Sequence, residues 1–207
     1  MIYDITPLVV PGMAVWPGDT PPSREVLLRL ARGDSVNLST LRATVHLGAH
    51  ADAPSHYGEG ARDIASQPLD PYLGPCELIR VRGVPGQPVR RDHLARRPGL
   101  PRLLLDTGTG STDPARFRED FAPLDPELVD FLHSAGVRLV GTDAPSVDPF
   151  DSKTLPAHHR FLEHDMAILE GLALDGVPEG AYELIALPLR LAEFEASPVR
   201  AVLRSLR

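Results

Sequence analysis

Apolar residues occur along this chain in many short runs rather than in long periodic stretches. Eight of the runs are rich in Val, Ile, Leu and Tyr, the residues that favour β-strands. We predict strands over residues 2–9, 26–30, 38–46, 77–81, 102–106, 137–142, 166–169 and 182–191. Twenty-two prolines and 17 glycines separate these runs, which favours brief elements joined by tight turns over a bundle of long helices.

Helical signals are fewer than strand signals. Residues 127–135 are predicted to form a helix, because Asp125 can cap its start, Pro126 suits its first turn and Gly136 can end it. Shorter helices are predicted over residues 91–97 and 156–163.

Strands dominate the first half of the chain and alternate with helices in the second half, which predicts a mixed α/β fold. We expect residues 1–207 to form one compact domain, since this length suits a single hydrophobic core. Residues 10–23 hold four prolines and are predicted to form a loop or arm. Such an arm could cover a pocket or cross to a neighbouring subunit at a small cost in entropy.

Composition excludes several classes of protein. The chain is 43% apolar and 24% charged, as soluble globular proteins are. Its formal charge of −7, without a basic stripe, argues against nucleic acid as a partner. Cys76 is the only cysteine, so no intrachain disulfide can form. The absence of a long apolar run or a basic and then apolar start leads us to expect no membrane partner and a cytoplasmic location.

The densest group of potential metal ligands lies between residues 44 and 57. Any one histidine could cap a turn or form a hydrogen bond within the core and bind no metal. Several histidines and an aspartate in a fixed order around a glycine and a proline, however, favour a metal site. Gly48 and Pro54 oppose a helix in this segment. Three of the eight histidines and one aspartate fall within eleven positions: His46, His50, Asp52 and His56.

A flat strand would not bring these ligands to one ion. It would hold the Cα atoms of His46 and His50 roughly 13 Å apart, at about 3.3 Å per residue, which strains the reach of metal bonds of about 2.0–2.1 Å. We therefore expect a bend at Gly48, through a bulge or a positive φ angle. Asp52 could bridge two cations about 3.5–4 Å apart. Further ligands would have to come from the other ligand-rich region: His158, His159, Glu163, His164 and Glu170.

The run HLGAHADAPSH at residues 46–56 resembles the signature His-x-Gly-Thr-His-x-Asp-x-Pro-x-His of the cyclase family of metal-dependent hydrolases. Ala49 stands where the family usually has threonine, which removes a hydroxyl group but no metal ligand. Within that family the chain is similar to the bacterial kynurenine formamidases (arylformamidases). The segments that carry this similarity are residues 15–20, 141–149, 155–159, 169–172, 182–191 and 196–201.

The resemblance implies a site for two divalent metal ions per subunit, with zinc as the expected ion. Asp52 and Glu170 would bridge the two ions. His158 would bind the second ion, and it is preferred to His159 because the family's histidine precedes the bridging glutamate by twelve residues. The implied ligands are His46, His50, Asp52, His158 and Glu170.

The resemblance also implies an activity. His56 would act as general acid and base, and Trp16 would stack on an aryl substrate. The reaction would be hydrolysis of N-formyl-L-kynurenine to L-kynurenine and formate, in a homodimer with a swivelling β/β/α fold. Two alternatives remain open: a family hydrolase of another amide, lactone or cyclic imide, and a noncatalytic metal-binding protein.

Overall fold

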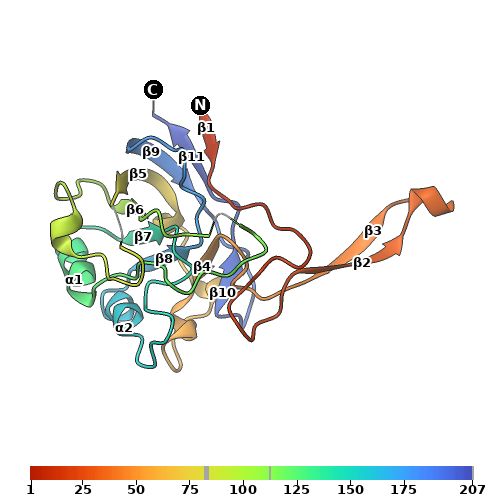
Figure 1. Ribbon diagram of the computed structural model, residues 1–207, viewed down its shortest axis with the longest axis horizontal. Coiled ribbons are helices and arrows are strands. Elements are labelled where there is room, and N and C mark those ends of the chain that lie inside the picture. The colour runs from red at the N-terminus through yellow and green to blue at the C-terminus, as the bar shows by residue number, and fades with distance from the viewer. Residues whose placement is uncertain (82–83, 112, 207) are drawn as a thin grey trace.

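The computed structural model describes residues 1–81, 84–111 and 113–206 (Figure 1). A nine-stranded sheet forms the body. In spatial order its strands are β1 (Ile2–Asp4), β11 (Val202–Ser205), β9 (Gly180–Ile185), β5 (Leu73–Arg80), β6 (Arg102–Asp106), β7 (Leu139–Thr142), β8 (Ala167–Glu170), β4 (His50–Asp52) and β10 (Ala196–Pro198). A separate hairpin comprises β2 (Ser23–Leu28) and β3 (Leu38–Arg42). The two α-helices of the described residues are α1 (Pro126–Ser134) and α2 (Pro156–Glu163).

Two apolar cores hold the body together. Strands β5, β6, β7 and β8 run parallel at the centre of the sheet, and such strands are apolar on both faces because both faces are covered. On one face, α1 and α2 cover Leu103, Leu105 and Ile168. The curled sheet encloses the second core, which includes Leu104 and Leu169. The expected compact mixed α/β fold is confirmed.

Several elements agree closely with the sequence. Strand β6 and helix α2 have the predicted bounds, and α1 is displaced from its prediction by one residue. The Asp125 side chain accepts a hydrogen bond from the backbone N–H of Glu127, and Gly136 has a φ of +86° just beyond the helix. The predicted start and end signals of α1 therefore act as expected.

Other predicted bounds are wrong. The strands expected over 2–9, 38–46 and 182–191 end earlier, at Asp4, Arg42 and Ile185. In the first and third of these segments proline follows the strand, at Pro7 and Pro188, and it lacks the N–H that a strand needs. The helix expected over 91–97 is reduced to one 3-10 turn, Arg91–His93. The short strands β4, β10 and β11 were not predicted. No helix in the described ranges has the length and apolarity needed to cross a membrane.

Candidate metal centre

The pairing of β4 with β8 creates the buried half of the site. These strands are antiparallel, and His50 lies directly opposite Glu170. Asp52 shares the face of His50 because side chains alternate along a strand. The Nε2 atom of His50 lies 3.4 Å from Oε2 of Glu170 and 3.5 Å from Oδ1 of Asp52. All three side chains are buried.

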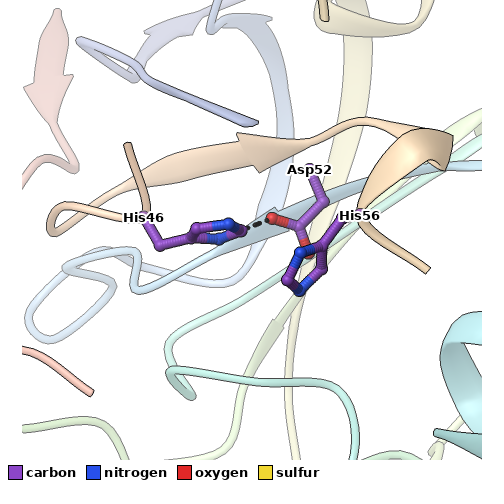
Figure 2. Close-up of side chains that lie close together, drawn as sticks. All are labelled: His46, Asp52 and His56. Atoms are coloured by element: carbon purple, nitrogen blue, oxygen red, sulfur yellow. Dashed lines mark ion pairs between the residues drawn. The ribbon is translucent and has the colours of Figure 1, made fainter. Parts of the chain in front are cut away.

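Two glycines let the flanking backbones meet. Gly48 has a φ of +57°, so the bend predicted at this residue is confirmed. Gly171, directly after Glu170, has a φ of +64°, and a Cβ atom there would lie 2.4 Å from the carbonyl oxygen of Gly48. The bend brings Nδ1 of His46 to within 3.2 Å of Oδ1 of Asp52 (Figure 2).

Helix α2 supplies His158 from the other side. Its Nε2 atom lies 3.4 Å from Oδ2 of Asp52 and 3.6 Å from Oε1 of Glu170. Each carboxylate thus presents one oxygen towards His50 and the other towards His158. His159 is exposed and lies outside this group. The structure therefore brings together all five residues expected as ligands, in an arrangement suited to bridging carboxylates.

The electrostatics of the group favour positive charge. Burial alone would lower the pKa of His50, but the nearby carboxylates of Glu170 and Asp52 raise it to about 9. Burial also opposes the charged form of His158, whereas the hydrogen bond to Asp148 and the nearby carboxylate of Asp52 raise its pKa to about 10. Burial of Asp52 is outweighed by these histidines, which hold its pKa well below the ordinary value. The buried carboxylates of Asp52 and Glu170 thus require cationic partners beside them.

The donor atoms of the group fit a metal ion. Among the described residues, several buried atoms have no hydrogen-bond partner, and they include Nε2 of His46, Nε2 of His50 and both carboxylate oxygens of Asp52. Buried polar atoms in proteins are almost always hydrogen-bonded, so unpartnered atoms on Asp52 and on the two histidines beside it indicate a ligand. Imidazole nitrogen with carboxylate oxygen is the donor set of zinc and similar divalent ions.

Neighbouring groups fix the orientation of the expected ligands. Asp148 accepts from Nδ1 of His158 at 2.7 Å and from the backbone N–H groups of Ala157 and His158. His50 donates from Nδ1 to the carbonyl of Gly48 at 2.9 Å. Such contacts direct Nε2 of each ring towards the carboxylates of Asp52 and Glu170, where a metal ion would be held. Nothing in the sequence spacing of Asp148 marks it as a residue that caps a helix eight positions later.

His56 stands beside the ligands on the 3-10 turn Pro54–His56. Its ring centre lies 4.4 Å from that of His46, and the two rings flank the carboxylate of Asp52 (Figure 2). The surrounding protein desolvates the ring and lowers its pKa, and the charge of Asp52 offsets only part of this effect. Although His56 can also be grouped with His46 and Asp52 as a possible ligand, the residue as a whole is exposed, unlike His50 and His158.

A cavity of about 920 Å³ opens above the group, and His46, His50, His56, His158 and Glu170 line it. Trp16 forms part of the wall, as expected for a substrate-binding residue, and it is held among phenylalanines that the sequence did not single out. The centre of its ring system lies 5.0 Å from that of Phe150 and 5.4 Å from that of Phe117, and Phe117 also lines the cavity. The cavity thus has a polar floor and an aromatic wall.

Residues 3–149, well over half of the chain, match the putative cyclase family. This chain belongs to the putative cyclase family. Two solved structures are each 30% identical to this family member with a TM-score of 0.81: a potential metal-dependent hydrolase with cyclase activity and a predicted metal-dependent hydrolase from Bacillus stearothermophilus. The match covers 98% of this chain in both cases, and 96% and 97% of those chains.

Isatin hydrolase A from Labrenzia aggregata, bound to benzyl benzoate, shares the fold. It has 24% identity and a TM-score of 0.80, over 98% of this chain and 93% of that one. The resemblance to the cyclase family is therefore confirmed, whereas the kynurenine formamidase branch stays a prediction.

Proposed function

We propose that this cyclase-family chain is a metal-dependent hydrolase of aryl amides, and that its substrate is N-formyl-L-kynurenine, which it converts to L-kynurenine and formate. The observation that carries the proposal is the set of unpartnered nitrogen and oxygen atoms on the floor of a cavity with an aromatic wall. The nitrogen and oxygen atoms of the floor could hold the metal ions that hydrolysis needs, and the aromatic wall could stack on a flat ring of the substrate.

The floor residues divide naturally into two sets. His46 and His50 would hold one divalent ion, His158 would hold the second, and Asp52 with Glu170 would bridge them. When bound, such ions supply Lewis acidity and lower the pKa of a water molecule towards neutrality. Zinc is the ion that we expect first.

His56 is the proton carrier in this proposal. Its lowered pKa keeps the ring neutral at neutral pH, so it can accept a proton from the attacking water. The same ring can then deliver that proton to the departing aniline nitrogen, which leaves more readily once protonated. Its position at the exposed edge of the ligand group, on the lining of the cavity, supports this role.

The mouth of the cavity suits an amino acid. Arg116, an exposed residue that lines it, can pair with a carboxylate group. Asp19 and Asp113 line the same cavity and can attract an ammonium group. Kynurenine and its formyl derivative carry both groups on the side chain, and their aryl ring can stack on Trp16.

A cyclic aryl amide such as isatin is the second candidate. The likeness in fold to isatin hydrolase A favours it, and isatin also carries its scissile amide nitrogen on a benzene ring. Isatin has no amino-acid group, however, so it would leave Arg116 without a role.

A substrate panel with one pair of variants tests the proposal. Metal-loaded protein should hydrolyse N-formyl-L-kynurenine with a higher kcat/KM than formanilide or isatin, and a chelator should abolish all three activities. Arg116→Ala should raise KM for N-formyl-L-kynurenine by up to about fivefold, as expected for one exposed ion pair, and should leave formanilide unaffected. Arg138→Ala, which removes an exposed arginine that does not line the cavity, should change neither.

Each other outcome points to a different function. Preference for isatin would replace the proposed substrate with a cyclic amide, and an equal effect of Arg116→Ala on all substrates would remove the amino-acid site. If metal-loaded protein turned over no amide, lactone or imide, the noncatalytic alternative would stand.

A further inference from the structure

Asp143 directly follows β7, and its buried carboxylate bonds to the loop that follows β6. Its Oδ1 atom accepts from the backbone N–H of Thr107 at 2.9 Å and from the hydroxyl of the same residue at 2.6 Å. Its Oδ2 atom accepts from the backbone N–H groups of Thr109 at 3.1 Å and Gly110 at 3.0 Å. A carboxylate has about four acceptor sites, so these donors leave Asp143 no free site for a substrate, although it lines the cavity.

Hydroxyl groups extend these contacts along the chain. The hydroxyl of Thr107 donates to Asp143, so the hydroxyl of Thr109, 2.6 Å away, must be the donor to Thr107. Oγ1 of Thr109 in turn accepts from the backbone N–H of Ala122 at 2.8 Å. The Asp143 network, which comprises Asp143, Thr107, Thr109, Gly110 and Ala122, thus joins both ends of the segment that runs from residue 110 to residue 122.

The loop also approaches the backbone of Asp143 closely. A Cβ atom at Gly110 would lie 2.5 Å from the carbonyl oxygen of Asp143, closer than two such atoms can approach. Glycine is therefore needed where the loop meets Asp143. The position of the loop is fixed by this contact and by the buried hydrogen bonds together.

The segment that the network holds carries part of the cavity wall. Arg116 and Phe117 both line the cavity, and the ring of Phe117 lies edge-on to that of Trp16, with centres 5.4 Å apart. The carbonyl of Pro114 accepts from the backbone N–H of Ala14 at 2.7 Å, which ties the segment to the loop that carries Trp16. Arg116 is exposed and Phe117 is half-buried, so the restraint on the segment comes mainly from its buried base.

We propose that Asp143 is a positioning residue that sets substrate specificity, because it holds Arg116 and Phe117 at the cavity wall. An aryl amide with a carboxylate on its side chain uses both wall residues and depends on Asp143. An aryl amide without that side chain depends on it less. The choice of N-formyl-L-kynurenine as the test substrate rests on the proposed function, whereas the role of Asp143 in holding the wall does not.

Kinetics of the metal-loaded protein test this role. Asp143→Ala should raise KM for N-formyl-L-kynurenine about tenfold, because the ion pair with Arg116 and the aryl contact at the wall are both displaced. KM for formanilide should rise less. Metal content and kcat should stay near wild type for both substrates, since the wall contributes binding and the floor contributes the chemistry. Asp143→Asn keeps one acceptor oxygen and should recover part of the loss.

Two further variants separate positioning from stability. Thr142→Val is the matched control: it removes a neighbouring buried hydroxyl, which accepts from the backbone of Ala144, and leaves the Asp143 network intact. It should lower stability and leave KM unchanged for both substrates. Thr107→Val removes one hydroxyl from the network but keeps the backbone bonds to Asp143. It should raise KM for N-formyl-L-kynurenine by a smaller factor, and it keeps the test decisive if Asp143→Ala does not fold.

Quenching of tryptophan fluorescence by acrylamide tests the network without any substrate. Trp16 is the only tryptophan and lies half-buried beside Phe117, so a displaced wall should expose it. Quenching should be stronger in Asp143→Ala and Thr107→Val than in wild type and Thr142→Val. If the wild type does not hydrolyse N-formyl-L-kynurenine, the proposed substrate fails and quenching alone decides the role of Asp143. Unchanged quenching in both network variants, or an equal rise in KM in Thr142→Val, would overturn the proposal.

Discussion

The floor and the wall of the cavity are built differently. The floor residues Asp52 and Glu170 come from adjacent strands of the main sheet, are buried, and have neighbours fixed by hydrogen bonds. The wall residues Trp16 and Phe117 come from loops and are only half-buried. Rigid elements thus hold the groups that need accurate placement, while loops carry the groups that choose the substrate. Substitutions in the floor should lower metal affinity and the catalytic rate, and substitutions in the wall should change substrate preference.

The largest effect is expected from Asp52→Ala. Both metal positions lose an oxygen ligand, so the loss in metal affinity should exceed the roughly 10–100-fold typical of residues that only orient ligands. Metal content after dialysis, measured by elemental analysis, should fall at both positions, and activity should fall with it. Asp151→Ala, at an exposed aspartate outside the cavity lining, is the control. Two ions held at wild-type affinity would show that Asp52 is not a bridge.

His56→Asn should give the next largest effect, and it should lower the catalytic rate without changing metal binding. If His56 carries the proton, kcat should fall about 10²–10⁴-fold, with metal content and fold preserved. The limb of the pH–rate profile that reports the acid should flatten. An activated aryl ester, whose leaving group depends less on protonation, should suffer less than the formamide. Loss of an ion in proportion to the lost activity would instead make His56 a ligand.

Asp148→Ala tests the residue that orients His158. Metal affinity should fall about 10–100-fold, and kcat should largely recover at saturating metal. Because Asp148 also accepts from the first turn of α2, unfolding free energy should fall by about 0.5–2 kcal/mol. Asp125→Ala removes the matching cap of α1 and should cost similar stability without changing metal affinity. Equal metal affinity in both variants would limit Asp148 to a structural role.

Trp16→Ala should have the smallest effect, and it concerns the wall alone. Stacking on an aryl ring is worth about 0.5–1.5 kcal/mol beyond burial, so kcat/KM for N-formyl-L-kynurenine should fall up to about tenfold. Metal content should not change, and Trp16→Phe should recover part of the loss. Unchanged kinetics would leave Trp16 as an anchor that packs the loop against Phe150.

The sequence predicted best where local chemistry decides the structure. Strand β6 is a continuous apolar run, and α1 carries its own start and stop signals. The bend at Gly48 followed from the length of a strand and the reach of a metal bond. The five ligands and His56, which the family resemblance implied, also lie together.

Features that depend on distant partners escaped prediction. Strand β4 has only three residues and is a strand because β8 and β10 flank it. Asp148 orients His158 across a loop, and Phe117 meets Trp16 from a separate segment. The strands of the hairpin were expected in outline, but their separation from the body can be seen only in three dimensions (Figure 1).

Metal titration of metal-free protein tests the central claim most directly. Protein stripped by a chelator and verified by elemental analysis should be inactive on N-formyl-L-kynurenine. Activity should return on addition of zinc or another divalent ion and should reach its plateau at two ions per chain, because two carboxylates each face histidines on both sides. Full activity in protein proven to be metal-free would contradict the account.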